Sequence, residues 1–260
     1  MTYKTITLSY EDRVALLTLN RPDKRNAISF DLVDEVLHAL TEVERSNALV
    51  LVLTGAGKAF SGGLDLENLK ALIGRSQEQT LHDTQTMARL FRTIYELPKP
   101  TVAAVNGPAI AGGTGLATLC DITIASTEAK FGYTEVRIGF IPAIVSSFLV
   151  RQVGEKQARD LLLTGRIFDA AEAYRIGLIN EVVEPDRLMP RVKEVVATLL
   201  ENSPLSLLAT KKLINSFGHE ELGRQIESGI VENARSRTTK DFNEGVTSFL
   251  EKRKPVWSGQ

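Results

Sequence analysis

From Thr101 to Leu116 the chain reads TVAAVNGPAIAGGTGL, an apolar, partly β-branched run followed by a glycine-rich segment. The first five residues predict a buried strand, and Asn106-Gly107-Pro108 predicts the turn that ends it. Glycines such as Gly112 let backbone N–H groups approach a ligand closely. Where such a turn opens a helix, the helix dipole adds to those N–H groups, so the turn suits a developing oxyanion.

An earlier glycine-rich turn also follows an apolar run, and residues 58–66 there read KAFSGGLDL. It is not a phosphate-binding loop, because that motif needs Gly and Ser or Thr where this chain has Val52 and Ala59. The later turn does not match the dinucleotide-binding fingerprint either, since Thr118 stands where its third Gly is required. Each turn alone is equally compatible with tight packing.

The first two-thirds of the chain alternate short apolar runs with helical patterns, which predicts an α/β fold. Strands are expected at residues 14–19, 49–54, 101–105 and 121–125. A helix is expected after Ser29, a predicted N-cap, with another ending before Pro98. Beyond about Leu188 the strand signals stop, and helices are expected at residues 205–217, 220–237 and 241–253. We predict two parts, a core over residues 1–195 and a helical region over 196–260.

Composition excludes several classes of protein. Of the 260 residues, 31 are Lys or Arg and 32 are Asp or Glu, so the charge gives no reason to expect a nucleic acid or membrane partner. The single cysteine, Cys120, fits a reducing compartment, and we expect a cytoplasmic protein. The three histidines are scattered without the spacing of metal ligands, so no metal is expected.

One carboxylate follows the second glycine turn. Glu135 lies in the segment FGYTEVRIG, whose surroundings are small and mostly apolar. A carboxylate at low dielectric has a raised pKa and can act as a base near neutral pH. The alternative is a surface residue paired with Arg137.

Taken in order, these segments resemble the enoyl-CoA hydratase/isomerase (crotonase) family over nearly the whole chain. The resemblance extends from NRPDKRNAIS at residues 20–29, through TGAGKAF at 54–60 and LLTGR at 162–166, to FLEKR at 249–253. It implies a crotonase-like spiral of repeated ββα units with C-terminal helices for trimerisation, sometimes paired into hexamers. It also implies an acyl-CoA substrate, whose coenzyme A is part of the substrate and not a separate cofactor.

The resemblance also assigns the site. The thioester enolate would be stabilised by the backbone N–H groups of Leu64 and Gly112, with Glu135 as the acid–base residue. Contacts with the coenzyme A portion would come from eight further residues, namely Lys24, Arg25, Ala27, Gly63, Asp65, Leu66, Phe249 and Lys252. Of these, Phe249 and Lys252 would reach the ligand of a neighbouring subunit, and Asp65 also has an alternative role in holding its turn.

The sequence departs from typical hydratases at two places. Gly115 stands where a second glutamate is usual, and the bulkier Ile144 and Val145 replace part of a run of glycines. A water molecule filling the space at Gly115 would let one glutamate hydrate a 2-enoyl-CoA, including branched substrates such as methylglutaconyl-CoA. The alternatives are a double-bond isomerase that uses Glu135 alone and a weakly catalytic acyl-CoA-binding protein.

Overall fold

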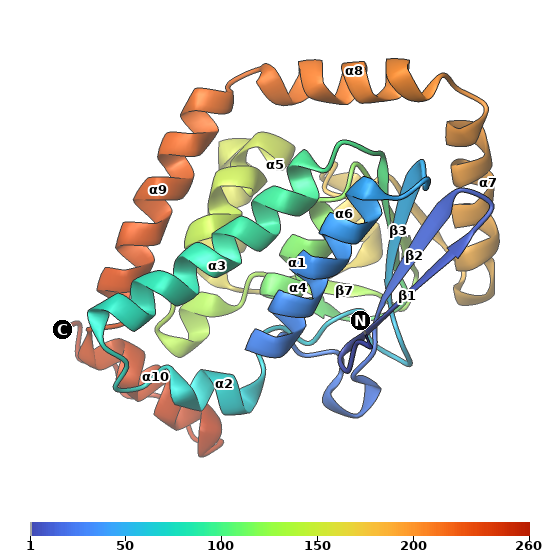
Figure 1. The fold of residues 1–260 in the computed structure, drawn as a ribbon. Coiled ribbons are helices and arrows are strands. Elements are labelled where there is room, and N and C mark those ends of the chain that lie inside the picture. Colours follow the sequence, from blue (N-terminus) through green and yellow to red (C-terminus); the bar gives the residue numbers. More distant parts are fainter. Residues whose placement is uncertain (1) are drawn as a thin grey trace.

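The computed structural model describes residues 2–260, which form two sheets and the helices packed around them (Figure 1). The strands are β1 (Ile6–Glu11), β2 (Val14–Leu19), β3 (Val50–Gly55), β4 (Thr101–Val105), β5 (Ala109–Ile110), β6 (Ile122–Ser126), β7 (Lys130–Gly132), β8 (Ile167–Asp169) and β9 (Glu181–Val183). The α-helices are α1 (Phe30–Arg45), α2 (Leu66–Ala71), α3 (Gln77–Glu96), α4 (Gly112–Thr118), α5 (Ala143–Thr164), α6 (Ala170–Arg175), α7 (Leu188–Leu200), α8 (Pro204–Ser216), α9 (His219–Ser236) and α10 (Lys240–Leu250). Three short 3₁₀ helices are η1 (Pro22–Lys24), η2 (Glu135–Ile138) and η3 (Pro185–Arg187).

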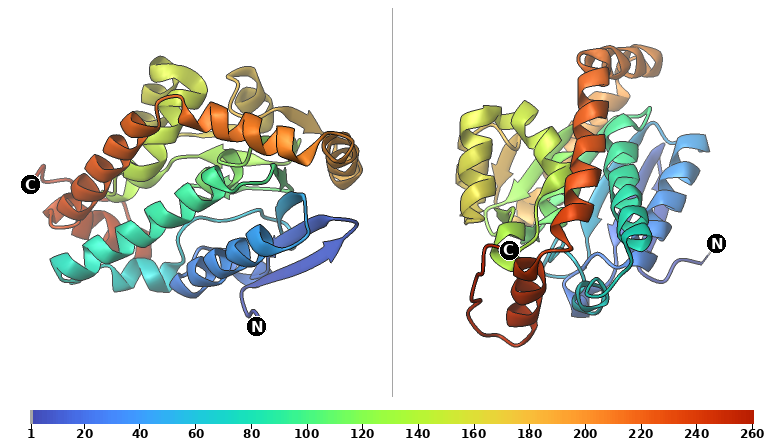
Figure 2. Two further views of the ribbon diagram at one scale, coloured as in Figure 1. Left: turned by 45° about the horizontal axis from the view of Figure 1, so that its top comes forward. Right: turned by 90° about the vertical axis from the view of Figure 1, so that its left-hand side faces the viewer.

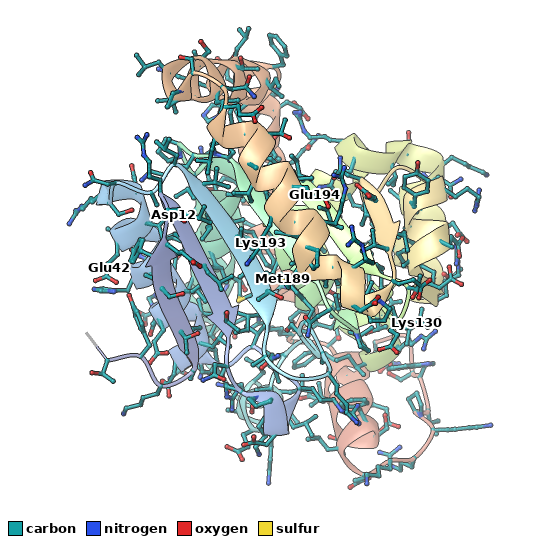
Figure 3. The ribbon with its side chains drawn as sticks, turned by 90° about the vertical axis from the view of Figure 1, so that its right-hand side faces the viewer. Asp12, Glu42, Lys130, Met189, Lys193 and Glu194 are labelled. Carbon is teal, nitrogen blue, oxygen red and sulfur yellow. The ribbon has the colours of Figure 1, made fainter. Side chains whose placement is uncertain are left out.

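The larger sheet has the strand order β1-β2-β3-β4-β6-β9, and only β1 runs antiparallel to its neighbour. Alternate side chains of β3 enter two separate cores, because successive residues of a strand point to opposite faces. Leu51 and Leu53 join the core beneath α1 and α3, whereas Val50 and Val52 pack with α7. Figure 3 shows α7 lying across this second face, with Met189, Lys193 and Glu194 labelled along it.

The smaller sheet has the order β5-β7-β8 and brings the two halves of the site together. Ala109 and Ile110 pair with Phe131 and Gly132, so the glycine-rich segment after β5 lies beside the residues that lead into η2. The strands of this sheet are two or three residues long and have too few residues to show an alternating pattern. The sequence therefore did not predict them.

The longer predicted elements are confirmed, and most of their ends lie within one or two residues of the predicted positions. Ser29 caps α1 by accepting a hydrogen bond from the Leu32 N–H at 3.2 Å. The α/β core followed by C-terminal helices is likewise as expected. After α7, helix α8 runs along the edge of the molecule to α9, which returns to pack against α3 and α5 (Figures 1 and 2). Helix α10 packs against α2 and η2.

Candidate active site

Two backbone N–H groups at the glycine turns have no partner within residues 2–260. The turn after Phe60 is held by its neighbours, since Ile28 donates to the Gly63 carbonyl at 2.7 Å and Asp65 donates to the Ile28 carbonyl at 2.9 Å. The Leu64 N–H between them makes no hydrogen bond to the described residues, nor does that of Gly112. Gly112 is the first residue of α4, where the helix itself leaves N–H groups unsatisfied.

The two turns touch each other. A Cβ placed on Gly63 would lie 3.0 Å from the Ile110 carbonyl oxygen, so this position, with φ of +87°, needs glycine. Ala111 adopts φ 51° and ψ −122°, an unfavourable conformation for a residue with a side chain, immediately before Gly112. Its N–H donates to the Gly132 carbonyl at 2.6 Å, which helps to hold that conformation.

Glu135 lies at the start of η2 and faces the same cavity. Its Oε2 is shielded from solvent and has no hydrogen-bond partner among residues 2–260. Burial raises the pKa of Glu135 from 4.5 to about 7, and only a hydrogen bond with its own backbone opposes that rise. The segment after η2 is fixed by Gly139, where a Cβ would lie 2.3 Å from the Asp241 carbonyl oxygen of α10. A carboxyl group with this pKa can take up and return a proton near neutral pH.

These groups line one cavity of about 550 Å³, whose walls are mostly apolar. Gly115 is closely packed, because a Cβ there would lie 2.8 Å from Val145 Cγ1 and 3.3 Å from Phe91 Cζ. Val145 would have to shift before this position could carry a side chain, and a water molecule near Gly115 stays a prediction. Of the described residues that line the cavity, Asp83 provides the other carboxylate.

The predicted site residues separate into two groups. Gly63, Leu64, Gly112, Glu135 and Phe249 all line the cavity of their own chain. The remaining predicted contacts do not line it, and they comprise Lys24, Arg25, Ala27, Asp65, Leu66 and Lys252. Phe249 reaches the cavity without a second subunit, although it was expected to contact a neighbour's ligand.

The loop around residues 21–27 lies against the first glycine turn. Gly62 lines the cavity and donates its N–H to the Arg25 carbonyl at 2.8 Å, which connects the exposed Lys24 and Arg25 to that turn. Both backbone groups of Ala27 have partners within the chain. Its N–H donates to the Lys24 carbonyl at 3.1 Å, and its carbonyl accepts from Arg21 Nη1 at 2.7 Å.

Asp65 holds its turn. Its carboxylate accepts from the Glu67 N–H at 2.9 Å as the N-cap of α2 and pairs with Arg21 Nη2 at 2.9 Å. Desolvation raises the pKa of Asp65, but Arg21 and the backbone N–H groups of Glu67 and Asn68 outweigh it, so the pKa lies below its usual range. This geometry agrees with the alternative that the sequence analysis gave for this residue.

Sequence reasoning missed a polar cluster in the cavity wall. It consists of Asp83 and Thr84 from α3, Asn233 from α9 and Arg237 just after α9. Thr84 donates to Asn233 Oδ1 at 3.0 Å, and Arg237 Nη1 lies 3.6 Å from Asp83 Oδ2. No local motif marks these residues, because they lie about 150 positions apart and polar side chains on a helix usually indicate its solvent face.

Within residues 2–260, no three His, Cys, Asp or Glu side chains gather so that they could hold a metal ion. No helix of the described chain is long and apolar enough to span a bilayer.

The fold and the cavity define an α/β protein in which one cavity is lined by a carboxylate with a buried oxygen and by two backbone N–H groups without partners among residues 2–260. Comparison with known proteins gives the family: the model for "Enoyl-CoA hydratase/isomerase" matches residues 9–260. A putative enoyl-CoA hydratase of Thermus thermophilus is 44% identical over 243 residues, covering 93% of this chain and 96% of the relative. A crotonyl-CoA hydratase of Syntrophomonas wolfei is 37% identical, covering 98% of each chain. The crystal structure of an enoyl-CoA hydratase/isomerase from Xanthobacter autotrophicus Py2 superposes with a TM-score of 0.90 at 28% identity, covering 96% of this chain and 94% of that one.

The chain belongs to the enoyl-CoA hydratase/isomerase family. It is an enzyme of the enoyl-CoA hydratase superfamily, a hydro-lyase.

Proposed function

We propose that this enzyme hydrates a 2-enoyl-CoA to a 3-hydroxyacyl-CoA with Glu135 as its single acid–base residue. The observation that carries the proposal is one cavity lined by Glu135, Leu64 and Gly112, the last two with N–H groups that have no partner among residues 2–260. The crotonyl-CoA hydratase activity in the name of the Syntrophomonas wolfei relative supports this reaction.

The reaction needs one proton to leave water and one to arrive at C2. Glu135, as the carboxylate, removes a proton from a water molecule whose oxygen forms a bond to C3. The C2–C3 π electrons then move onto the thioester, and the oxyanion accepts hydrogen bonds from the N–H groups of Leu64 and Gly112. Glu135 returns the proton to C2, which restores the thioester and the free carboxylate. Removal of one such oxyanion donor typically costs about 10²–10³ in rate.

A second reaction is favoured by the packing at Gly115. Val145 and Phe91 leave no room there for another carboxylate. Moving a double bond between C3 and C2 needs only one base, which takes a proton from C4 and delivers it to C2 over the same enolate. Isomerisation of a 3-enoyl-CoA is therefore the second candidate for this site.

The coenzyme A portion is proposed to lie along the loop that carries Lys24 and Arg25. Both side chains are exposed, and the loop is bonded to Gly62, which lines the cavity. Lys24 pairs with the exposed Glu67 at 3.6 Å, an ion pair that a phosphate group can replace. We also propose a trimer or hexamer. Helix α8 and the residue after it leave four large apolar side chains more than half exposed, as expected of a subunit interface: Leu205, Leu213, Ile214 and Phe217.

The test is a paired assay on crotonyl-CoA and a 3-enoyl-CoA, with the products identified by mass. Hydration predicts a gain of one water from crotonyl-CoA, and Glu135→Gln should abolish that gain. A 2-enoyl product from the 3-enoyl substrate, with no water gained from either, would show isomerisation instead. Coenzyme A ester binding without turnover in either assay, and without hydration of methylglutaconyl-CoA, would refute both reactions.

A further inference from the structure

One polar feature of the cavity wall is a guanidinium that makes no hydrogen bond to the described residues. The Arg237 side chain is only 7% exposed, and its Nε and Nη1 are buried with no partner among residues 2–260. Its guanidinium carbon lies 5.0 Å from the centre of the Phe140 ring. Phe140 in turn donates its N–H to the Glu135 carbonyl at 3.1 Å. Arg237 therefore contacts the segment of the cavity wall that carries the proposed catalytic residue.

Arg237 shares its nearest carboxylate with a second guanidinium group. Arg75 Nη1 donates to Asp83 Oδ1 at 3.0 Å, and Arg237 approaches the other oxygen of the same carboxylate at 3.6 Å. That second oxygen, Oδ2, is itself buried without a hydrogen bond. Two guanidinium groups therefore share the Asp83 carboxylate, and Arg75, which also lines a neighbouring pocket with Asp34, makes the closer contact. The other polar groups nearby, from Thr84 and Asn233, are neutral and bonded to each other.

An apolar acyl chain would leave the buried Nε and Nη1 of Arg237 without a hydrogen-bond acceptor. A buried cation is strongly disfavoured unless it is paired and hydrogen-bonded. Desolvation lowers the pKa of Arg237 to about 10 despite Asp83, which agrees with incomplete pairing. A carboxylate offers two acceptor oxygens, and guanidinium groups bind carboxylates through paired hydrogen bonds.

We propose that the acyl pocket takes an acyl-CoA whose acyl chain carries a second carboxylate, and that Arg237 binds that carboxylate. This inference rests on the proposed function, since it assigns the acyl chain to the cavity that holds Glu135. Arg237 is then a specificity-determining residue. The class includes methylglutaconyl-CoA, one of the substrates considered from the sequence.

Binding of unreactive saturated esters tests this without turnover. Succinyl-, glutaryl- and adipyl-CoA are compared with butyryl-, pentanoyl- and hexanoyl-CoA by isothermal titration calorimetry on the wild-type protein. A charge-assisted hydrogen bond predicts that at least one dicarboxylic ester binds about 10–100 times more tightly than its methyl-ended counterpart. No preference for any of the three would overturn the proposal, and that comparison needs no variant.

Variants then test whether Arg237 causes the preference for dicarboxylic esters. Arg237→Gln should remove the preference and leave the affinity for the methyl-ended esters within about threefold. Arg237→Lys, which keeps the positive charge, should retain part of the preference for dicarboxylic esters. Arg235→Gln is the matched control, because Arg235 stands two residues earlier and its side chain is 79% exposed. Equal weakening of both ester series in Arg237→Gln would instead assign Arg237 to coenzyme A binding or to folding. If the protein prefers dicarboxylic esters but hydrates no 2-enoyl-CoA, the proposed function is refuted and the inference about Arg237 is not.

Discussion

Replacing Glu135 by Gln is expected to abolish turnover and at the same time to stabilise the folded protein. The carboxyl group has a pKa of about 7 in the folded protein and 4.5 in its ordinary state. That difference corresponds to about 3–3.5 kcal/mol of destabilisation when the group is ionised. Gln cannot ionise, so the variant avoids this cost. It also cannot move a proton, so hydration should fall by about 10²–10⁴-fold.

The sign of the stability change depends on pH. Below pH 4.5 the carboxyl group is protonated in both states and contributes no difference. Between pH 4.5 and about 7 the folded state keeps a proton that the unfolded state has lost, so wild-type stability falls as the pH rises. Above pH 7 the cost is fully present. The advantage of Glu135→Gln should therefore be small at pH 5 and complete at pH 8.

Urea unfolding at pH 5 and pH 8 measures the stability, and initial rates of hydration measure the activity. Wild-type kcat/KM should rise about tenfold between pH 6 and pH 8, because the ionised fraction of a group with a pKa of about 7 rises by that factor. Glu155→Gln is the control, since its side chain is 67% exposed on α5. A stability gain that is the same at both pH values, or turnover above a tenth of wild type in Glu135→Gln, would refute this reasoning.

Three further predictions concern packing, charge and assembly. Gly115→Ala should lower the free energy of unfolding by about 1–3 kcal/mol through overpacking against Val145. A double-mutant cycle with Val145→Ala should give a coupling energy of about 1 kcal/mol, and a coupling energy of zero would contradict this cause. Arg21→Met should cost about 2–3 kcal/mol at neutral pH by leaving the buried Asp65 unpaired. Because the pKa of Asp65 is lowered, that loss should shrink as the pH falls through the folded pKa, and a loss in urea unfolding that is independent of pH would exclude the pair as its cause. Phe217→Glu, at a position 64% exposed, should reduce the mass of the assembly in light scattering, whereas an unchanged mass would remove that residue from any interface.

Local signals were sufficient for the longer elements. The run at residues 14–19 and the cap at Ser29 each depend on interactions within a few residues, so the sequence alone predicts them. The strands β5, β7 and β8 are different, because pairing between distant segments stabilises strands of two or three residues. These strands bring Gly112 and Glu135 to the same cavity, which the sequence could suggest only through the family resemblance.

The chain by itself determined the α/β class, the two glycine turns and the choice of Glu135, since those depend on local composition and ordered motifs. Only the tertiary structure decided what surrounds them. It filled the place beside Gly115 with Val145 and Phe91, and it raised the pKa of Glu135 by burial. It also brought Arg237 into the cavity, because helices distant in the sequence pack together there to exclude water. Burial and charge balance are properties of that packing, so they cannot be predicted from any single stretch of the sequence.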